Sequence, residues 1–116
     1  MAMTDQPRLN LRSFPAGENL RIDAYWRDDH LAKGPCMSLY AGSIEVMRFD
    51  LDPEQPHEHW AHGDRERMYY PAGVDPFLLA ENSLVNRWDH AITLVGVYGS
   101  GENIVEAAAD AVAYLR

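Results

Sequence analysis

Apolar side chains alternate with polar ones along the first half of the chain, in short runs separated by turn residues. The clearest run is 20–28, where alternate positions hold the apolar residues Ile22, Ala24 and Trp26. Successive side chains of a β-strand point to opposite faces, so this pattern predicts a half-buried strand. The stretch that follows, "DDHLAKGP", is typical of a turn.

The segment 36–51 predicts two further strands joined by a tight hairpin. Its apolar residues lie at odd positions before Gly42 and at even positions just after it, as expected where a short turn reverses the chain. The parity changes again after Val46, which predicts either a β-bulge or burial on both faces of the strand.

Pro53 and Pro56 end this strand, because proline cannot donate a hydrogen bond to a neighbouring strand. From Glu58 the chain can return as an extended segment through "RERMYY". We therefore expect an antiparallel meander of about four strands.

After Gly73 the apolar residues recur at spacings of three and four, which is typical of an α-helix. Asp75 and Pro76 form a good N-cap and first-turn pair, and one long helix is expected to end at Gly99. The stretch 91–98 is apolar on all sides and partly β-branched, so a buried strand is the alternative there, although we favour a helix.

The last segment, "ENIVEAAADAVAYLR", predicts an amphipathic helix with an acidic outer face. The expected fold class is therefore α+β: an antiparallel sheet of about four strands, a meander, followed by two C-terminal helices packed on it. A chain of 116 residues is long enough for one domain, which we place at 13–116 after a flexible N-terminus at 1–12.

Composition indicates a cytoplasmic, bacterial protein. The chain has no apolar run of membrane-spanning length and no signal pattern at its N-terminus, and arginine greatly outnumbers lysine, as in GC-rich bacterial genes. Its single cysteine, Cys36, suits a reducing compartment and is expected to be buried filler. The formal charge of −8 argues against broad, non-specific nucleic-acid binding.

Candidate chemistry is concentrated in "PHEHWAHGDRERMYY", residues 56–70. On a strand His57 and His59 point to the same face, and the pair could bind a divalent metal such as zinc, nickel or iron. The third ligand would be His62 or Asp64, which requires a bend of the chain at Gly63. The predicted metal set is therefore His57, His59 and His62.

Acid–base catalysis is the alternative use of the same segment. His59 or His62 could move a proton in phosphodiester cleavage, while Arg65 and Arg67 hold the phosphate and stabilise the charged intermediate. These four residues are the catalytic candidates. The simplest alternative is that the histidines and acids of this segment are only solvent-facing partners on a polar strand.

The segments "SLYAGSIEVMRFDLD" and "HEHWAHGDRERMYY" resemble the TumE-like family of small bacterial toxin components over about residues 20–70. The matching residues are Ser38, Leu39, Tyr40, Phe49, Asp50, His59, His62, Gly63, Arg65, Glu66 and Tyr69. The resemblance implies a small sheet with a C-terminal helix, a helix-turn-helix DNA-binding antitoxin as partner, and toxicity directed at RNA or another phosphate-containing target. An inactive relative that kept the fold is the alternative within the family.

A non-enzymatic interaction or ligand-binding domain is the alternative from a different class. The long helix carries an apolar face and the last helix is rich in alanine, so both could bury surface in a homodimer through the C-terminal helices. Packing within the monomer would account for the same face, whose residues are Leu84, Trp88, Ile92, Val95 and Tyr98.

Overall fold

The computed structural model describes residues 7–30, 33–61 and 67–116. They form one antiparallel sheet in which each strand pairs with the next along the chain. The strands are β1 (Leu9–Gly17), β2 (Leu20–Asp28), β3 (Lys33–Ala41), β4 (Ile44–Asp50), β5 (His57–Trp60) and β6 (Met68–Tyr69), and the helices are α1 (Pro76–Val95) and α2 (Ile104–Leu115). The predicted α+β class, with two C-terminal helices, is confirmed.

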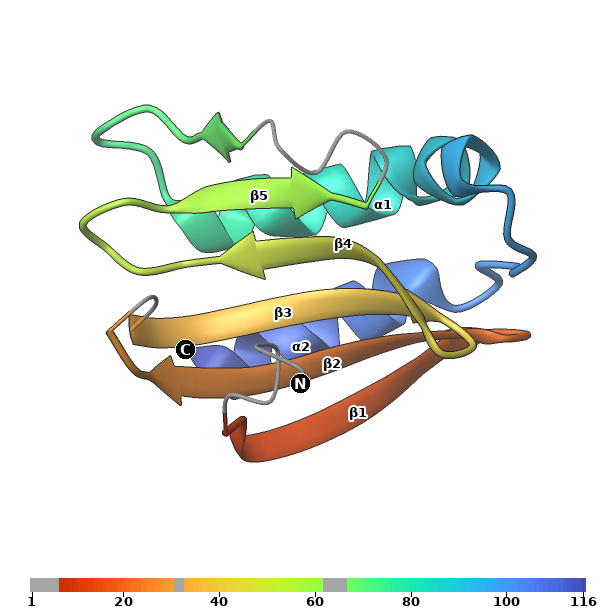
Figure 1. Ribbon diagram of the computed structural model, residues 1–116, viewed down its shortest axis with the longest axis horizontal. Helices are drawn as coiled ribbons and strands as arrows, with labels where there is room; N and C mark the ends of the chain where they lie inside the picture. The colour runs from red at the N-terminus through yellow and green to blue at the C-terminus, as the bar shows by residue number, and fades with distance from the viewer. Residues whose placement is uncertain (1–6, 31–32, 62–66) are drawn as a thin grey trace.

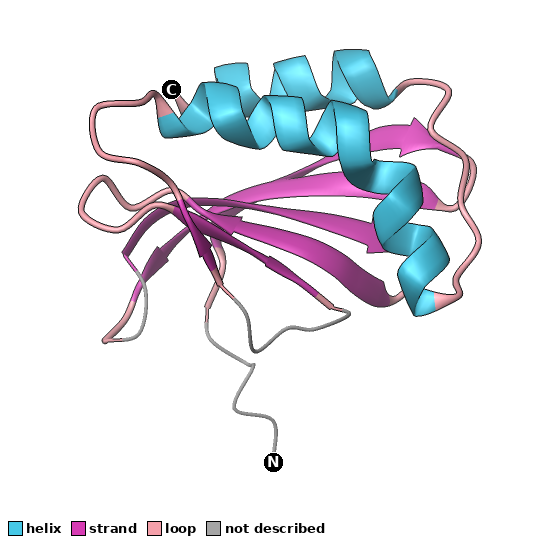
Figure 2. Ribbon diagram, turned by 90° about the horizontal axis from the view of Figure 1, so that it is seen from above, coloured by secondary structure: helices cyan, strands magenta, loops and turns pink. Residues whose placement is uncertain are grey.

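Both helices lie on one face of the sheet, where they form a second layer (Figures 1 and 2). Helix α2 packs on β1, β2 and β3, and α1 packs on β4 and β5, so the two helices share the sheet between them. Within the described residues no helix covers the opposite face, which we call the open face. The hydrophobic core fills the space between the two layers.

The predicted number of strands was wrong, because the sheet has six strands and the prediction had four. The first missed strand, β1, begins at Leu9, within the stretch predicted to be flexible. Its pattern is irregular: Asn10 has a positive φ of 54°, and the pairing with β2 shifts register near both ends of the strand. Leu9 and Leu11 alternate with polar residues but are exposed. The apolar parity changes before the buried Phe14 and Ala16, so no continuous alternation marked the strand in the sequence.

The extended segment predicted from Glu58 onward divides into two strands, which accounts for the other additional strand. β5 covers only His57–Trp60, and β6 is the two-residue strand Met68–Tyr69, paired with His57 and Glu58. Both residues of β6 are exposed, so β6 carries no apolar periodicity that a sequence could reveal.

The predicted hairpin is confirmed, and of the two alternatives for the second parity change the structure has the bulge; together they decide which residues of β4 face the helices. Ala41 pairs with Ile44 across a two-residue turn, in which Gly42 has a positive φ of 61° that favours glycine. The register then shifts between Leu39 and Tyr40 of β3, so that Val46 and Met47 are both buried.

The predicted N-cap of α1 is confirmed and its predicted end is wrong. The side chain of Asp75 accepts a hydrogen bond from the backbone N–H of Phe77, as an N-cap should. The helix stops at Val95 rather than Gly99, because Gly96 adopts the left-handed conformation and its N–H bonds back to Ile92 and Thr93.

The apolar face of α1 contributes to the core of the monomer. Leu84 and Ile92 are buried, Trp88 and Val95 pack against the core while partly exposed, and Tyr98 lies beyond the helix and is exposed. The homodimer stays a prediction. No helix in the described part of the chain has the length and apolar character needed to cross a membrane.

A buried carboxyl group ties β5 to the helical layer. Glu58 is 2% exposed and points toward α1, although its neighbours in the sequence are both histidines. Its oxygens accept hydrogen bonds from Trp60 Nε1 at 2.8 Å, Tyr70 Oη at 2.6 Å and Ser83 Oγ at 3.1 Å. A buried carboxyl group needs such donors, so these bonds hold β5 with Glu58 inward and both histidines outward.

Replacing Tyr70 by phenylalanine is expected to lower the free energy of unfolding by about 1–3 kcal/mol, because one oxygen of buried Glu58 loses its donor. The matched control is Tyr69→Phe, which removes the same hydroxyl from an exposed neighbouring residue and should change stability by less than about 0.5 kcal/mol. Urea denaturation of both variants measures the difference. Equal losses in the two variants would contradict the role assigned to Glu58.

Candidate functional site

The open face of the sheet carries two rows of polar side chains that run across the strands. Residues that pair directly across neighbouring strands share a face. The first row runs from β2 to β6 and consists of Tyr25, Cys36, Asp50, His57 and Tyr69. The second row runs from β2 to β5 and consists of Asp23, Ser38, Arg48 and His59. Side chains of four strands therefore meet around the β4–β5 pair.

Three side chains of these rows converge on one point. His57 Nε2, His59 Nε2 and Asp50 Oδ2 lie 3.0 Å from one another in all three pairings. All three side chains are largely buried, with exposed fractions of 13% for each histidine and 8% for the aspartate. We call this group the Asp–His–His triad.

Hydrogen atoms alone satisfy the triad poorly while Asp50 is ionised. An imidazole nitrogen either donates or accepts a hydrogen bond, and a carboxylate oxygen only accepts. If both histidines donate to Asp50, two N–H groups face each other at 3.0 Å, and if one does not, its bare nitrogen faces the carboxylate oxygen. A cation that contacts all three lone pairs would make every contact favourable.

Neighbouring groups orient two members of the triad. Nδ1 of His57 lies 2.7 Å from the carbonyl oxygen of Gln55, which can only accept, so this nitrogen carries a hydrogen. In the neutral ring the lone pair is then on Nε2, which faces the triad. The thiol of Cys36 lies 3.4 Å from Oδ1 of Asp50 and can donate to it, which leaves Oδ2 for the histidines.

The pKa values of these groups reflect the same contacts. Burial alone would raise the pKa of Asp50, but hydrogen bonds from His57 and His59 and the charge of Arg48 hold it well below its usual range. Burial would lower the pKa of His57, yet its contact with Asp50 raises that pKa overall. Burial and the nearby Asp50 raise the pKa of the Cys36 thiol, so the thiol stays neutral and keeps its hydrogen.

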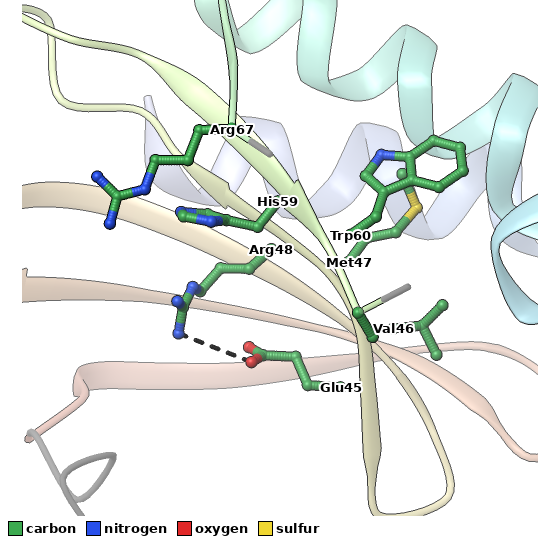
Figure 3. A pocket seen from close by; sticks show the side chains of 8 residues that line it. Glu45, Val46, Met47, Arg48, His59, Trp60 and Arg67 are labelled. Carbon is green, nitrogen blue, oxygen red and sulfur yellow. Dashed lines mark ion pairs between the residues drawn. The ribbon is translucent and has the colours of Figure 1, made fainter. Parts of the chain in front are cut away.

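A pocket of about 530 Å³ adjoins the triad on the side of His59. In Figure 3 the side chains of Arg48, His59 and Arg67 extend to one side of the strands, while Trp60 and Met47 lie toward the helices. Arg48 pairs directly with His59 on the neighbouring strand, and its guanidinium lies 3.7 Å from Glu45. Two positively charged side chains therefore border the pocket beside a histidine of the triad.

The predicted site residues can now be placed. His57 and His59 lie on one face and meet, as the alternation along a strand predicts, and Arg67 lines the pocket with His59. Two of the other candidates, His62 and Arg65, fall outside the described residues. Within the described residues the third member of the metal-ligating group is Asp50.

Sequence reasoning missed Asp50, Arg48 and Cys36 as members of the site. Asp50 is the last residue of β4, directly before the turn that leads to His57, and the two residues pair across that turn. Folding "DLDPEQPHEH" back on itself as a hairpin would have identified the pair. Cys36 had no such signal, because its place beside Asp50 depends on the register between β3 and β4.

The spacing of the triad matches one face of an octahedral metal site. Ligand atoms about 2.1 Å from an ion and at right angles to each other lie about 3.0 Å apart, whereas tetrahedral angles place them about 3.4 Å apart. An ion at that distance from all three atoms would lie about 1.2 Å above their plane. Two imidazoles and one carboxylate are typical ligands of iron(II), manganese, cobalt and zinc ions.

No protein-family model matches the chain, and no curated protein or solved structure is significantly similar to it. The TumE-like relationship therefore stays a prediction. A function for this chain has to be inferred from the chemistry of the triad and of the pocket beside it.

Proposed function

We propose that the protein binds one divalent transition-metal ion through Asp50 Oδ2, His57 Nε2 and His59 Nε2, on the open face of the sheet. The observation that supports this most is the set of three mutual 3.0 Å distances among atoms that hydrogen atoms alone satisfy poorly. The bond from His57 to the Gln55 carbonyl supports it as well, because ligating histidines commonly donate their other N–H to such a group.

A three-residue facial arrangement leaves further coordination positions for water or substrate. An ion held in this way can lower the pKa of a bound water, or polarise an oxygen of a substrate. The pocket beside His59 is where such a substrate would lie. The proposed class is therefore a metal-dependent protein with a substrate site between β4, β5 and Arg67.

Acid–base cleavage of phosphodiesters is the second candidate function. The observation that favours it is that His59 shares its pocket with Arg48 and Arg67, so a proton-transfer group and two phosphate-binding groups are close together. In this candidate His59 moves the proton and no metal ion is needed. The predicted toxin activity and its helix-turn-helix antitoxin belong to this candidate.

Metal titration tests the first proposal. Untagged wild-type protein, stripped with chelator, is expected to bind one equivalent of Mn²⁺ or Co²⁺ by calorimetry. Asp50→Asn and His59→Ala should each weaken that binding on the order of 100-fold, because each removes one of three ligands. Bound Co²⁺ should show the weak visible absorption of six-coordinate geometry.

The matched control for this titration is His90→Ala, which removes an exposed histidine of α1 that packs beside Trp60, on the face of the sheet opposite the triad. Its metal binding should equal that of the wild type. His57→Gln serves as a further ligand variant if another proves unstable, with circular dichroism used to verify folding. Wild-type binding that is absent, or unchanged in all the ligand variants, would refute the proposal.

Cys36 is expected to support metal binding through Asp50. Cys36→Ala should weaken Mn²⁺ binding by about tenfold or more, because Asp50 Oδ1 loses a neighbouring donor. Cys36→Ser retains a donor of similar size and should bind nearly as tightly as the wild type. If alanine and serine weaken binding equally while both variants stay folded, the role of the thiol is packing alone.

The second candidate predicts growth arrest and RNA cleavage when the wild type is induced in a bacterial host, with both effects lost in His59→Ala and kept in His90→Ala. Purified protein then separates the two chemistries. Cleavage that persists in excess EDTA is acid–base chemistry, and cleavage that chelation abolishes is metal-dependent. Normal growth with intact RNA at good expression would remove the second candidate.

A further inference from the structure

Arg48 has hydrogen-bonding capacity that the described residues leave unused. Its Nε is buried and finds no hydrogen-bond partner among them, and its ion pair with Glu45 is long at 3.7 Å. Glu45 also accepts from Ser38 Oγ at 2.6 Å and from Arg8 at 3.3 Å, so it is shared among several donors. The buried Nε is out of reach of a ligand, but the Arg48 side chain is 30% exposed, so an anion in the pocket can pair with the terminal nitrogens of its guanidinium.

Arg67 adds a second positive charge at the same pocket. It is exposed and forms no ion pair with any residue in the part of the chain that the structure describes. Arg48 and Arg67 both line the pocket that His59 also lines, so their charges lie beside the triad. The two arginines balance the negative charges of Asp50 and Glu45, so the site without an ion is about neutral in a chain with a formal charge of −8.

The charges around a loaded metal site favour a dianion. The ion would contribute two positive charges and the two arginines one each, while Asp50 and Glu45 each contribute one negative charge. At least two positive charges then remain for a ligand to balance, and a third remains if the charge of Arg8, which pairs with Glu45, is counted. A phosphate monoester carries nearly two negative charges at neutral pH, and its several oxygens can contact an ion and a guanidinium together.

We infer that the pocket binds the phosphate group of a phosphomonoester, with one phosphate oxygen on the metal ion and the others paired with Arg48 and Arg67. This inference rests on the proposed metal site. The pocket volume of about 530 Å³ exceeds what a phosphate group needs, and it falls in the range of small-molecule sites, so the rest of a phosphorylated metabolite has room.

The test uses the full chain, Mn²⁺ and inorganic phosphate as the probe, in two measurements. Calorimetry first determines the Mn²⁺ affinity of the wild type, Arg48→Gln and Arg67→Gln. The ³¹P relaxation of phosphate is then followed as Mn²⁺-loaded protein is added, because a paramagnetic ion broadens only a phosphate bound beside it. The matched control is Arg87→Gln, which removes the same charge from an exposed residue of α1.

The wild type and Arg87→Gln are expected to broaden the phosphate signal saturably. Arg48→Gln should weaken phosphate binding by about tenfold or more and Arg67→Gln by less, because Arg67 is exposed, with each variant compared at full Mn²⁺ loading as set by its own measured Mn²⁺ affinity. Normal Mn²⁺ binding without saturable broadening, or with equal broadening in every variant, would overturn this inference and leave the metal site standing. Displacement of bound phosphate by an equal concentration of acetate would also overturn this inference.

Absence of the proposed metal site gives a result that differs from failure of the phosphate inference alone. If the wild type takes up no Mn²⁺ in the first measurement, the proposed function is refuted, and the phosphate inference is overturned with it. The calorimetric step therefore separates the two failures before any phosphate is added.

Discussion

The hydrogen bonds to the buried carboxyl group of Glu58 are the constraint on which the site depends. β5 is only four residues long and pairs with a two-residue strand on its outer side, so backbone pairing alone holds it weakly. Donors from β5 itself, from the residue after β6 and from α1 converge on Glu58. Because side chains alternate along a strand, holding Glu58 inward places His57 and His59 together on the open face.

A second constraint comes from the bulge in β4. Val46 and Met47 are both buried, and the extra residue returns the strand to a register in which Phe49 points to the core. Arg48 and Asp50 consequently point to the open face, directly opposite His59 and His57. Without the bulge the two halves of β4 could not both bury their apolar residues, so the same feature serves the core and the site.

The chemistry of the site depends on how close two imidazoles and one carboxylate lie to one another. His57 Nε2, His59 Nε2 and Asp50 Oδ2 lie 3.0 Å apart in a largely buried position, and two arginines lie beside them. The stability of the rest of the fold, above all of the core beneath β4 and β5, offsets the energetic cost of this arrangement. Each side chain is held by its strand and its neighbours, so the triad is in place before any ligand arrives.

Much of the fold was predictable because its signals are local. The strand at 20–28, the hairpin at Gly42, the bulge near Val46 and the N-cap at Asp75 each depend on a few neighbouring residues. β1 and β6 were missed because they have exposed or irregular residues, and their existence depends on pairing with β2 and β5. The end of α1 was misplaced because either of two glycines could have stopped it, and the structure uses Gly96.

The sequence by itself determined the α+β class and the shared face of His57 and His59, since each follows from periodicity along one segment. Only the tertiary structure decided that Asp50 completes the triad, that Arg48 lies opposite His59 and that Cys36 lies against the carboxylate. These contacts join different strands, and their geometry depends on inter-strand register, which the hairpin, the bulge and the burial of Glu58 set together.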